Sequence, residues 1–330
     1  MLFCKHGLLL MCFMLLDGFY IFTYVNQRFY IMIDWNGVFP AVTTKFDAHD
    51  RIDRVLQEKN LRAQLDAGVH GIILGGTLGE ASTLTLEEKE TLVKLTLDVC
   101  GDQVPVILNI AEGSTKAAIH QAELAARWGA SGLMLLPAMR YKTDYDETVT
   151  WFRDIASSTD LPVMIYNNPV DYRTEVTLEM FAELSSLSNI QAVKESTRDV
   201  SNVTRMINTF GNRYQILCGV DTLAMESLVM GAHGWVAGLV CAFPKETVFI
   251  YNAIKAGNIT AALKVYRWFL PLLELDIHPK LVQYIKLAEA SVGLGAEYVR
   301  MPRLPLGGEE RNRVLAIIEQ SLKNRPTLTE

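Results

Sequence analysis

The sequence predicts an α/β protein built as a (β/α)8 barrel, also called a TIM barrel, with a C-terminal helical extension. Three observations predict this fold. From Trp35 onward, short apolar runs rich in Val, Ile and Leu alternate with segments of helical periodicity. The runs are apolar throughout, as expected of parallel strands that are covered on both faces. A Gly-x-x-Gly junction leads from helix to strand three times, which indicates a repeated αβ unit.

Eight strands are expected, at residues 38–43, 71–75, 104–110, 133–136, 163–167, 190–194, 215–219 and 235–240. The Gly-x-x-Gly junctions at 68–71, 129–132 and 231–234 precede three of them. The first glycine of each junction can adopt the left-handed conformation that ends a helix. The second glycine lets the chain turn tightly into the strand. A doubly wound open sheet is the alternative arrangement of such units.

Helices are expected between the strands, for example at 87–100, 116–128 and 178–187. Thr85 and Glu88 form a capping box at the start of the first of these. Beyond Pro244 the pattern is helical only, at 246–256, 259–273, 280–292 and 309–323. We assign residues 32–243 to the barrel, and 244–330 to its last helix and the extension. A length of 330 residues suits this division.

The first 31 residues differ from the rest. Residues 8–16 are continuously apolar, Asp17 interrupts the run, and 19–25 resume it. Met32 begins a stretch that reads like an enzyme start leading into a strand, so we expect 1–31 to be a dispensable extension from a mis-set start. A signal peptide, a membrane anchor and genuine structure remain alternatives. Asp17 would lie deep within a span, which argues against a membrane anchor.

The composition excludes several classes of protein. The net charge is −6 and no basic run occurs, so no nucleic-acid partner is expected. The five cysteines form no C-x-x-C pair, which is typical of reduced thiols in a cytoplasmic protein. The six histidines are scattered, so no metal site is expected. A Ser-His-Asp hydrolase would need a G-x-S-x-G elbow, which the sequence lacks.

Polar groups at the carboxyl ends of the strands are the candidate site, because barrel enzymes carry their chemistry there. After the second strand, the glycine-rich turn at 75–80 exposes N–H groups that could hold a carboxylate or phosphate. A plain βα turn is the alternative. After the fifth strand comes Tyr166, which could relay protons or simply be a core tyrosine.

Lys194 closes the sixth strand and is the most informative single residue. Lysine is rarely buried unless it is paired. If the ammonium group is partly desolvated, its pKa falls and the neutral amine becomes a nucleophile. The alternative is a surface lysine paired with the adjacent Glu195.

Taken together, G-T-x-G-E after strand two, Y-N-x-P after strand five and V-K-E after strand six make the chain resemble the dihydrodipicolinate synthase and N-acetylneuraminate lyase family. The resemblance runs from about Asn36 to the C-terminus. It implies that Lys194 forms the Schiff base, that Tyr166 moves protons, and that Thr77 is hydrogen-bonded to that tyrosine. It also implies a substrate-binding set, namely Gly76, Thr77, Leu78, Gly79, Gly219 and Gly238, in which the amides of Thr77 and Leu78 grip the carboxylate of a 2-oxo acid. No metal or organic cofactor is needed.

Three departures from the family pattern concern the substrate. Leu78 stands where the family has a hydroxyl residue. Met139 stands where synthases and neuraminate lyases carry a tyrosine, which in the synthases completes a proton relay across the subunit interface; Tyr141 is a candidate substitute. Arg173 could replace the synthase arginine that binds the second substrate only if its loop were two residues longer.

We therefore expect a cytoplasmic, cofactor-independent lyase that acts on pyruvate or another 2-oxo acid, as a catabolic aldolase, dehydratase or deaminase. A true 4-hydroxy-tetrahydrodipicolinate synthase is one alternative, and a non-catalytic keto-acid-binding barrel is another. A metal-dependent aldolase and a membrane-tethered barrel are further alternatives. The resemblance implies a homotetramer.

Overall fold

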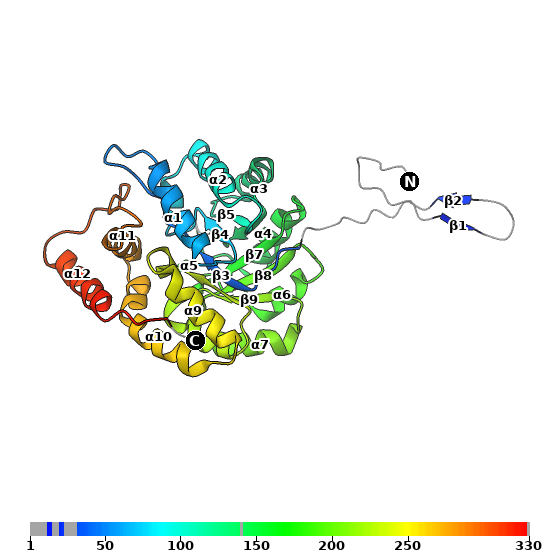
Figure 1. Ribbon diagram of the computed structural model, residues 1–330. Helices are drawn as coiled ribbons and strands as arrows, with labels where there is room; N and C mark the ends of the chain where they lie inside the picture. Colours follow the sequence, from blue (N-terminus) through cyan, green and yellow to red (C-terminus); the bar gives the residue numbers. More distant parts are fainter. Residues whose placement is uncertain (1–11, 15–19, 23–31, 139–140, 329–330) are drawn as a thin grey trace.

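The computed structural model describes residues 12–14, 20–22, 32–138 and 141–328. Eight parallel strands form its central sheet, and helices surround them (Figure 1). The strands are β3 (Gly37–Pro40), β4 (Ile72–Leu74), β5 (Val106–Ile110), β6 (Gly132–Leu135), β7 (Val163–Asn167), β8 (Ile190–Glu195), β9 (Gln215–Cys218) and β10 (Gly234–Ala237). All eight expected strands are present, with ends that differ by a few residues.

The sheet closes into a barrel. Hydrogen-bonded neighbours follow the order β3-β10-β9-β8-β7-β6-β5-β4. A parallel bridge between Ala41 and Ile73 joins the two remaining edges, and the Val42 amide donates to the Ile73 carbonyl at 3.0 Å. The (β/α)8 barrel is therefore confirmed, and the doubly wound open sheet is excluded because that sheet would keep two free edges.

The helices alternate with the strands and then continue beyond them. They are α1 (Arg54–Asp66), α2 (Leu86–Cys100), α3 (Thr115–Trp128), α4 (Tyr145–Ser157), α5 (Pro169–Tyr172), α6 (Leu178–Leu184), α7 (Ser201–Phe210), α8 (Ala224–Val229), α9 (Pro244–Lys255), α10 (Ile259–Leu273), α11 (Leu281–Ser291) and α12 (Gly308–Lys323). Four short 3-10 helices lie between these elements among the described residues: η1 (Ala81–Thr83), η2 (Asp221–Leu223), η3 (Leu239–Cys241) and η4 (Glu274–Ile277). The capping box of Thr85 and Glu88 is present at α2.

The three Gly-x-x-Gly junctions have the expected geometry at their first position. Gly68, Gly129 and Gly231 have φ values of 82°, 94° and 105°, which an L side chain rarely adopts. The second glycine is explained better by close packing than by the turn. A Cβ on Gly234 would lie 2.5 Å from the Gly37 carbonyl oxygen.

Two of these junctions contain a histidine in the same role. His70 Nδ1 accepts a hydrogen bond from the Val38 amide at 3.2 Å, and His233 Nδ1 accepts from the Ile216 amide at 3.0 Å. Each unprotonated nitrogen thus satisfies the amide of a neighbouring strand. Burial lowers the pKa of both imidazoles, because the charged form is poorly solvated there.

This arrangement predicts that acid weakens the barrel through these two groups. Above the ordinary histidine pKa of about 6.5, both the folded and the unfolded chain hold neutral imidazoles. As the pH falls through that value, the unfolded chain takes up protons that the folded chain does not, so the free energy of unfolding decreases. We expect the melting temperature to drop between about pH 7.5 and pH 5.5, and to drop less in the His70→Asn/His233→Asn variant. An equal drop in both proteins would contradict this account.

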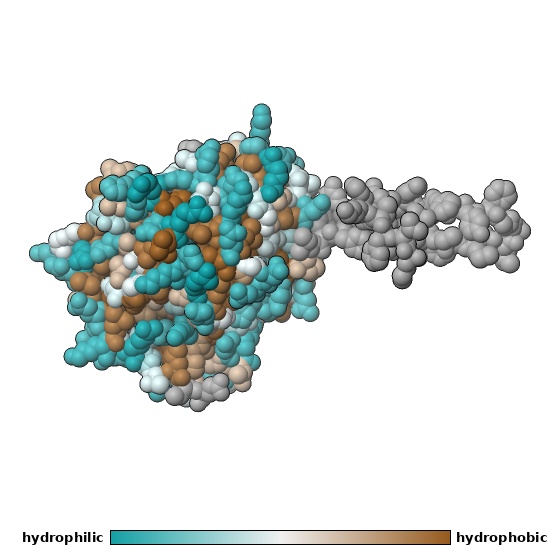
Figure 2. Space-filling model, turned by 45° about the horizontal axis from the view of Figure 1, so that its top comes forward, coloured by the Kyte–Doolittle hydropathy of each residue, from teal (hydrophilic) through white to brown (hydrophobic). Residues whose placement is uncertain are grey.

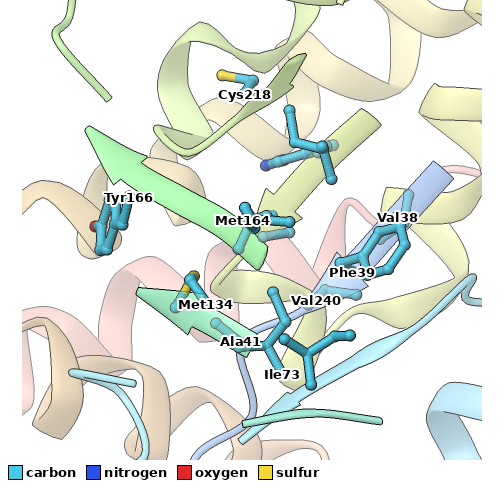
Figure 3. Close-up of a cluster of buried hydrophobic side chains, with 14 of the residues drawn as sticks. Val38, Phe39, Ala41, Ile73, Met134, Met164, Tyr166, Cys218 and Val240 are labelled. Atoms are coloured by element: carbon cyan, nitrogen blue, oxygen red, sulfur yellow. The ribbon is translucent and has the colours of Figure 1, made fainter. Parts of the chain in front are cut away.

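The barrel interior is filled by side chains from successive strands. Figure 3 shows a cluster of buried side chains that includes Val38 and Phe39 of β3, Ile73 of β4, Met134 of β6 and Met164 of β7. Met134 also lines the cavity described below, so it contributes to the floor of the site. The outer face mixes hydrophobic and hydrophilic side chains in the view of Figure 2.

The C-terminal helices pack beside the barrel (Figure 1). We propose that α9 is the eighth barrel helix, because it contacts β3 and β10, and that α10 to α12 form the extension. Two buried ion pairs tie α11 to the barrel: Lys286 with Glu80, and Glu289 with Lys45. The extension is therefore fixed to the loops that follow β3 and β4.

The expectations for residues 1–31 fall almost entirely outside the described residues. Within that range the structure describes β1 (Cys12–Met14) and β2 (Tyr20–Phe22), which pair in antiparallel fashion. The interpretation of this segment as a dispensable extension thus stays a prediction. Among the residues that the structure describes, no helix is both long and apolar enough to cross a membrane.

Candidate active site

A cavity of about 490 Å³ opens at the carboxyl ends of the strands. Residues from almost every turn of the barrel line it, as do residues of η4 and the segment after it. The predicted site residues Gly76, Thr77, Leu78, Tyr166, Lys194, Gly219 and Gly238 are among those that line the cavity. The structure thus brings seven of the eight predicted residues together; the exception is Gly79.

Lys194 is the central group. It lies at the end of β8, its side chain projects into the cavity, and only 8% of the residue is exposed. Burial lowers the pKa of its amine, against the opposing effect of nearby Tyr172, Asp276 and Asp221. The desolvated amine can therefore lose its proton more easily than an ordinary lysine and act as a nucleophile.

The alternative pairing of Lys194 with Glu195 is wrong. Consecutive residues of a strand point to opposite faces, so the Glu195 carboxylate lies away from the cavity. It accepts hydrogen bonds from the Thr197 amide and from Asn202 Nδ2, both at 2.8 Å.

Tyr166 lies next to Lys194 but presents its ring rather than its hydroxyl group. Lys194 Nζ is 3.9 Å from the centroid of the Tyr166 ring. The Tyr166 hydroxyl accepts a hydrogen bond from Asn168 Nδ2 at 3.1 Å. Burial raises the pKa of Tyr166 to about 12, so the phenol holds its proton at neutral pH.

The expected hydrogen bond between Thr77 and Tyr166 is absent, and Tyr172 takes that place. Thr77 Oγ1 and the Tyr172 hydroxyl share a hydrogen bond of 2.8 Å. The Tyr172 ring meets the Tyr166 ring edge-on, with centroids 5.5 Å apart. The physical reason is the short helix α5, which begins at Pro169 and turns Tyr172 back over the cavity.

The glycine-rich turn after β4 is held rigidly. Gly75 has a φ of 64°, and Glu80 is also left-handed, with a φ of 56°. The Glu80 side chain is fully buried, pairs with Lys286 and accepts from the Arg300 amide at 3.0 Å. The amides of Thr77 and Leu78 therefore sit on a fixed support beside the cavity, as a carboxylate grip requires.

Gly79 lies behind this turn rather than in the cavity wall. A Cβ at this position would meet the Gly75 amide nitrogen at 3.0 Å and the Val42 carbonyl oxygen at 3.2 Å. Its carbonyl accepts a hydrogen bond from Thr44 Oγ1 at 2.7 Å. Gly79 thus allows close packing beneath the turn, which supports the binding set without belonging to it.

Two other glycines make room for functional side chains. A Cβ on Gly219 would lie 2.6 Å from Lys194 Cγ and 2.7 Å from Lys194 Cε. A Cβ on Gly238 would lie 2.4 Å from Asp276 Oδ1. These glycines follow the adjacent strands β9 and β10, so Lys194 and Asp276 occupy neighbouring gaps at the barrel mouth.

The substitutes considered for missing family residues do not enter the cavity. Tyr141 is 58% exposed and donates a hydrogen bond to Glu147. Arg173 is exposed at the end of α5 and does not line the cavity. Met139 lies outside the described residues. The arginine that does line the cavity is Arg198, which pairs with Asp171 at 3.8 Å.

Sequence reasoning missed Tyr172, Arg198 and Asp276. Tyr172 stands three residues after the proline of Y-N-x-P, so the start of a short helix there was a usable signal. Arg198 lies four residues beyond Lys194, in the loop at the mouth of the same strand. Asp276 comes from the helical extension and offered no local signal. No group of three or more His, Cys, Asp or Glu side chains within the described ranges is placed to hold a metal ion.

The chain matches the family model described as the dihydrodipicolinate synthetase family over residues 34–321. It is 32% identical over 275 residues to a 4-hydroxy-tetrahydrodipicolinate synthase of Exiguobacterium sibiricum, covering 82% of this chain and 92% of that one. It is also 32% identical over 223 residues to an uncharacterized DapA-like lyase of Halobacterium salinarum, covering 68% and 73% respectively. The crystal structure of a dihydrodipicolinate synthase from Bacillus anthracis is similar, with a TM-score of 0.83, 30% identity, and coverage of 87% of this chain and 99% of that one.

Proposed function

Because this chain belongs to the dihydrodipicolinate synthetase family, whose members are class I, Schiff-base-forming lyases, we propose that Lys194 is its amine nucleophile and that pyruvate or a related 2-oxo acid is its substrate. The observation that carries the proposal is the buried Lys194 amine, which faces the same cavity as the Thr77 and Leu78 turn. The turn would hold the substrate carboxylate and so fix the ketone against the amine.

The reaction would begin when neutral Lys194 attacks the ketone and forms a carbinolamine. Loss of water then gives an iminium ion, which withdraws electrons from the neighbouring carbon. Both steps move protons between nitrogen and oxygen, so hydroxyl groups beside the amine are useful. Tyr166, Tyr172 and Thr77 supply such groups within one chain.

We further propose a catabolic subtype, namely an aldolase, dehydratase or deaminase, rather than the biosynthetic synthase. The support is the second-substrate side of the cavity, where Asp171 stands two residues after the proline and Arg173 is not part of the lining. The Asp171 carboxylate lies 3.8 Å from Arg198, the cavity arginine, and offsets part of its charge. We also propose a cytoplasmic homotetramer, to be checked by sedimentation of the purified protein.

The test is to incubate the protein with pyruvate, add borohydride and locate the modified residue by mass spectrometry. A reduced pyruvyl adduct on Lys194 is the expected result. No adduct, or an adduct on a different lysine, would overturn the proposal and leave a keto-acid-binding barrel.

Tyr172→Phe is expected to slow adduct formation by about 100-fold, because a proton-transferring hydroxyl of this kind contributes about 10²–10⁴. The ring contact with Tyr166 is kept, so the fold should be unchanged. Tyr141→Phe is the matched control, since Tyr141 lies outside the cavity, and it should react at the wild-type rate. The measurement is the time course of borohydride-trapped adduct. A slow Tyr141→Phe and a normal Tyr172→Phe would reverse the assignment.

A further inference from the structure

Asp276 is a cavity carboxyl group that the mechanism above leaves unused. It comes from η4, in the C-terminal extension, and lines the cavity together with Lys194. Among the described residues it takes part in no hydrogen bond or ion pair. Its negative charge nevertheless raises the pKa of the Lys194 amine, against the effect of burial. Asp276 is partly exposed, so its carboxyl group is open to a substrate that enters the cavity.

The position of Asp276 is set by the barrel itself. Its Oδ1 fits against Gly238, where a Cβ would come within 2.4 Å, and the Lys194 stem fits against Gly219 in the same way. Trp235 of β10 pairs with Cys218 of β9 in a parallel register. Gly219 and Gly238 follow these neighbouring strands, so both lie at the same end of the barrel. Neighbouring strands are about 4.8 Å apart. The carboxyl group and the amine therefore face the same small volume.

The other carboxylates near the site are already engaged. Asp221 accepts hydrogen bonds from Trp235 Nε1 at 2.8 Å and from the Leu239 amide at 2.8 Å. Asp171 is paired with Arg198, and Glu195 points away from the cavity. The two tyrosines are poor bases, because burial raises the pKa of each phenol.

Asp276 is, by contrast, made more basic by its surroundings. Burial raises its pKa well above the ordinary aspartate value, and the negative charge of Asp221 adds to that effect. A carboxyl group whose pKa moves toward neutral is suited to take up and return a proton during a reaction cycle.

We propose that Asp276 is the catalytic base that removes a proton from C3 of the Lys194 imine. The C3–H bond breaks, its electron pair forms the C2=C3 bond of the enamine, and the C=N⁺ electrons return to nitrogen. Asp276 holds the proton and gives it back when the enamine is protonated, or passes it to a leaving group on C4. No other reagent is needed for this step. The inference rests on the proposed function, since it requires the imine.

This role narrows the substrate class. Aldol cleavage makes the enamine by breaking a carbon–carbon bond, so it needs an acid that protonates C3 afterwards rather than a base that deprotonates it first. Dehydration and deamination of a 2-oxo acid make the enamine by losing the C3 proton, and then expel the group on C4. A base at C3 therefore points to a 2-oxo acid that loses a C3 proton as its imine, either to expel a hydroxyl or amine group from C4 or to add to an aldehyde.

The test measures two events in the same samples. Exchange of the pyruvate methyl protons for deuterium, followed by NMR in D2O, reports C3 deprotonation, and borohydride trapping reports the imine. We expect Asp276→Asn, whose amide fits the same gap at Gly238, to reduce exchange about 100-fold or more while the final yield of adduct is unchanged. Asp154→Asn, which alters an exposed carboxylate on α4 outside the cavity, is the control and should exchange at the wild-type rate.

Exchange by Asp276→Asn at close to the wild-type rate would overturn the inference, as would an equal loss in Asp154→Asn. If Asp276→Asn lacks a cooperative thermal transition, Asp276→Ala tests the same step, because it removes the carboxyl group and leaves the gap at Gly238 empty. Exchange should again fall while the adduct still forms, and unchanged exchange would again overturn the inference. Absence of an adduct in the wild-type protein would instead refute the proposed function. The two failures are therefore distinguishable.

Discussion

Lys194→Met is expected to abolish both the trapped adduct and turnover, with a loss on the order of 10⁴-fold or more in rate. Methionine keeps the length and the apolar stem of lysine but has no nucleophilic nitrogen. Without the amine no carbinolamine forms, and the remaining hydroxyl groups and amides can only bind the substrate. The cavity keeps its shape because Met would fit the same gap at Gly219.

This variant should be at least as thermally stable as the wild-type protein. Burial lowers the pKa of Lys194, which means that the folded site disfavours the charged amine. Replacing it with an apolar group removes that unfavourable term. Loss of activity with an unchanged or higher melting temperature would therefore separate a chemical role from a structural one.

Lys59→Met provides the control, because Lys59 is exposed on α1. It should give the wild-type yield of adduct on Lys194. Residual turnover by Lys194→Met within about tenfold of the wild-type rate would show that the reaction does not pass through this amine.

The barrel and the buried Lys194 at its mouth could be predicted because both leave local signals. A strand buried on both faces gives an apolar run, and a lysine at the end of such a run stands out at once. The left-handed glycines at 68, 129 and 231 mark the junctions for the same local reason, since few other residues adopt that conformation.

The parts of the site that escaped prediction depend on how distant segments meet. The bond between Thr77 and Tyr172 joins residues 95 positions apart, and the resemblance assigned that bond to Tyr166 instead. Asp276 reaches the cavity because η4 folds back over the barrel mouth, which no spacing in the sequence encodes. At Met139 the family resemblance indicated a missing tyrosine but did not indicate which residue would replace it.

The buried pair of Glu80 and Lys286 joins a turn that was predicted from the sequence to a helix of the C-terminal extension. Glu80 ends the turn that we propose binds the substrate carboxylate, and Lys286 lies on α11 in the extension. Lys286 Nζ also donates to the Tyr298 carbonyl at 2.6 Å, and the other Glu80 oxygen accepts from the Arg300 amide. The extension thus fixes the turn that the proposed mechanism relies on to orient the substrate.

Lys286→Met is expected to lower the free energy of unfolding by about 3–5 kcal/mol, because it leaves the fully buried Glu80 carboxylate with only the more distant Arg303, at 3.7 Å, as an ion-pair partner. The measurement is chemical denaturation monitored by circular dichroism. The double variant Glu80→Gln/Lys286→Met removes both charges and should recover part of the lost stability, since an uncharged amide costs less to bury than an unpaired carboxylate. A single variant as stable as the wild-type protein would contradict this account and would mean that Arg300 and Arg303 hold Glu80 without Lys286.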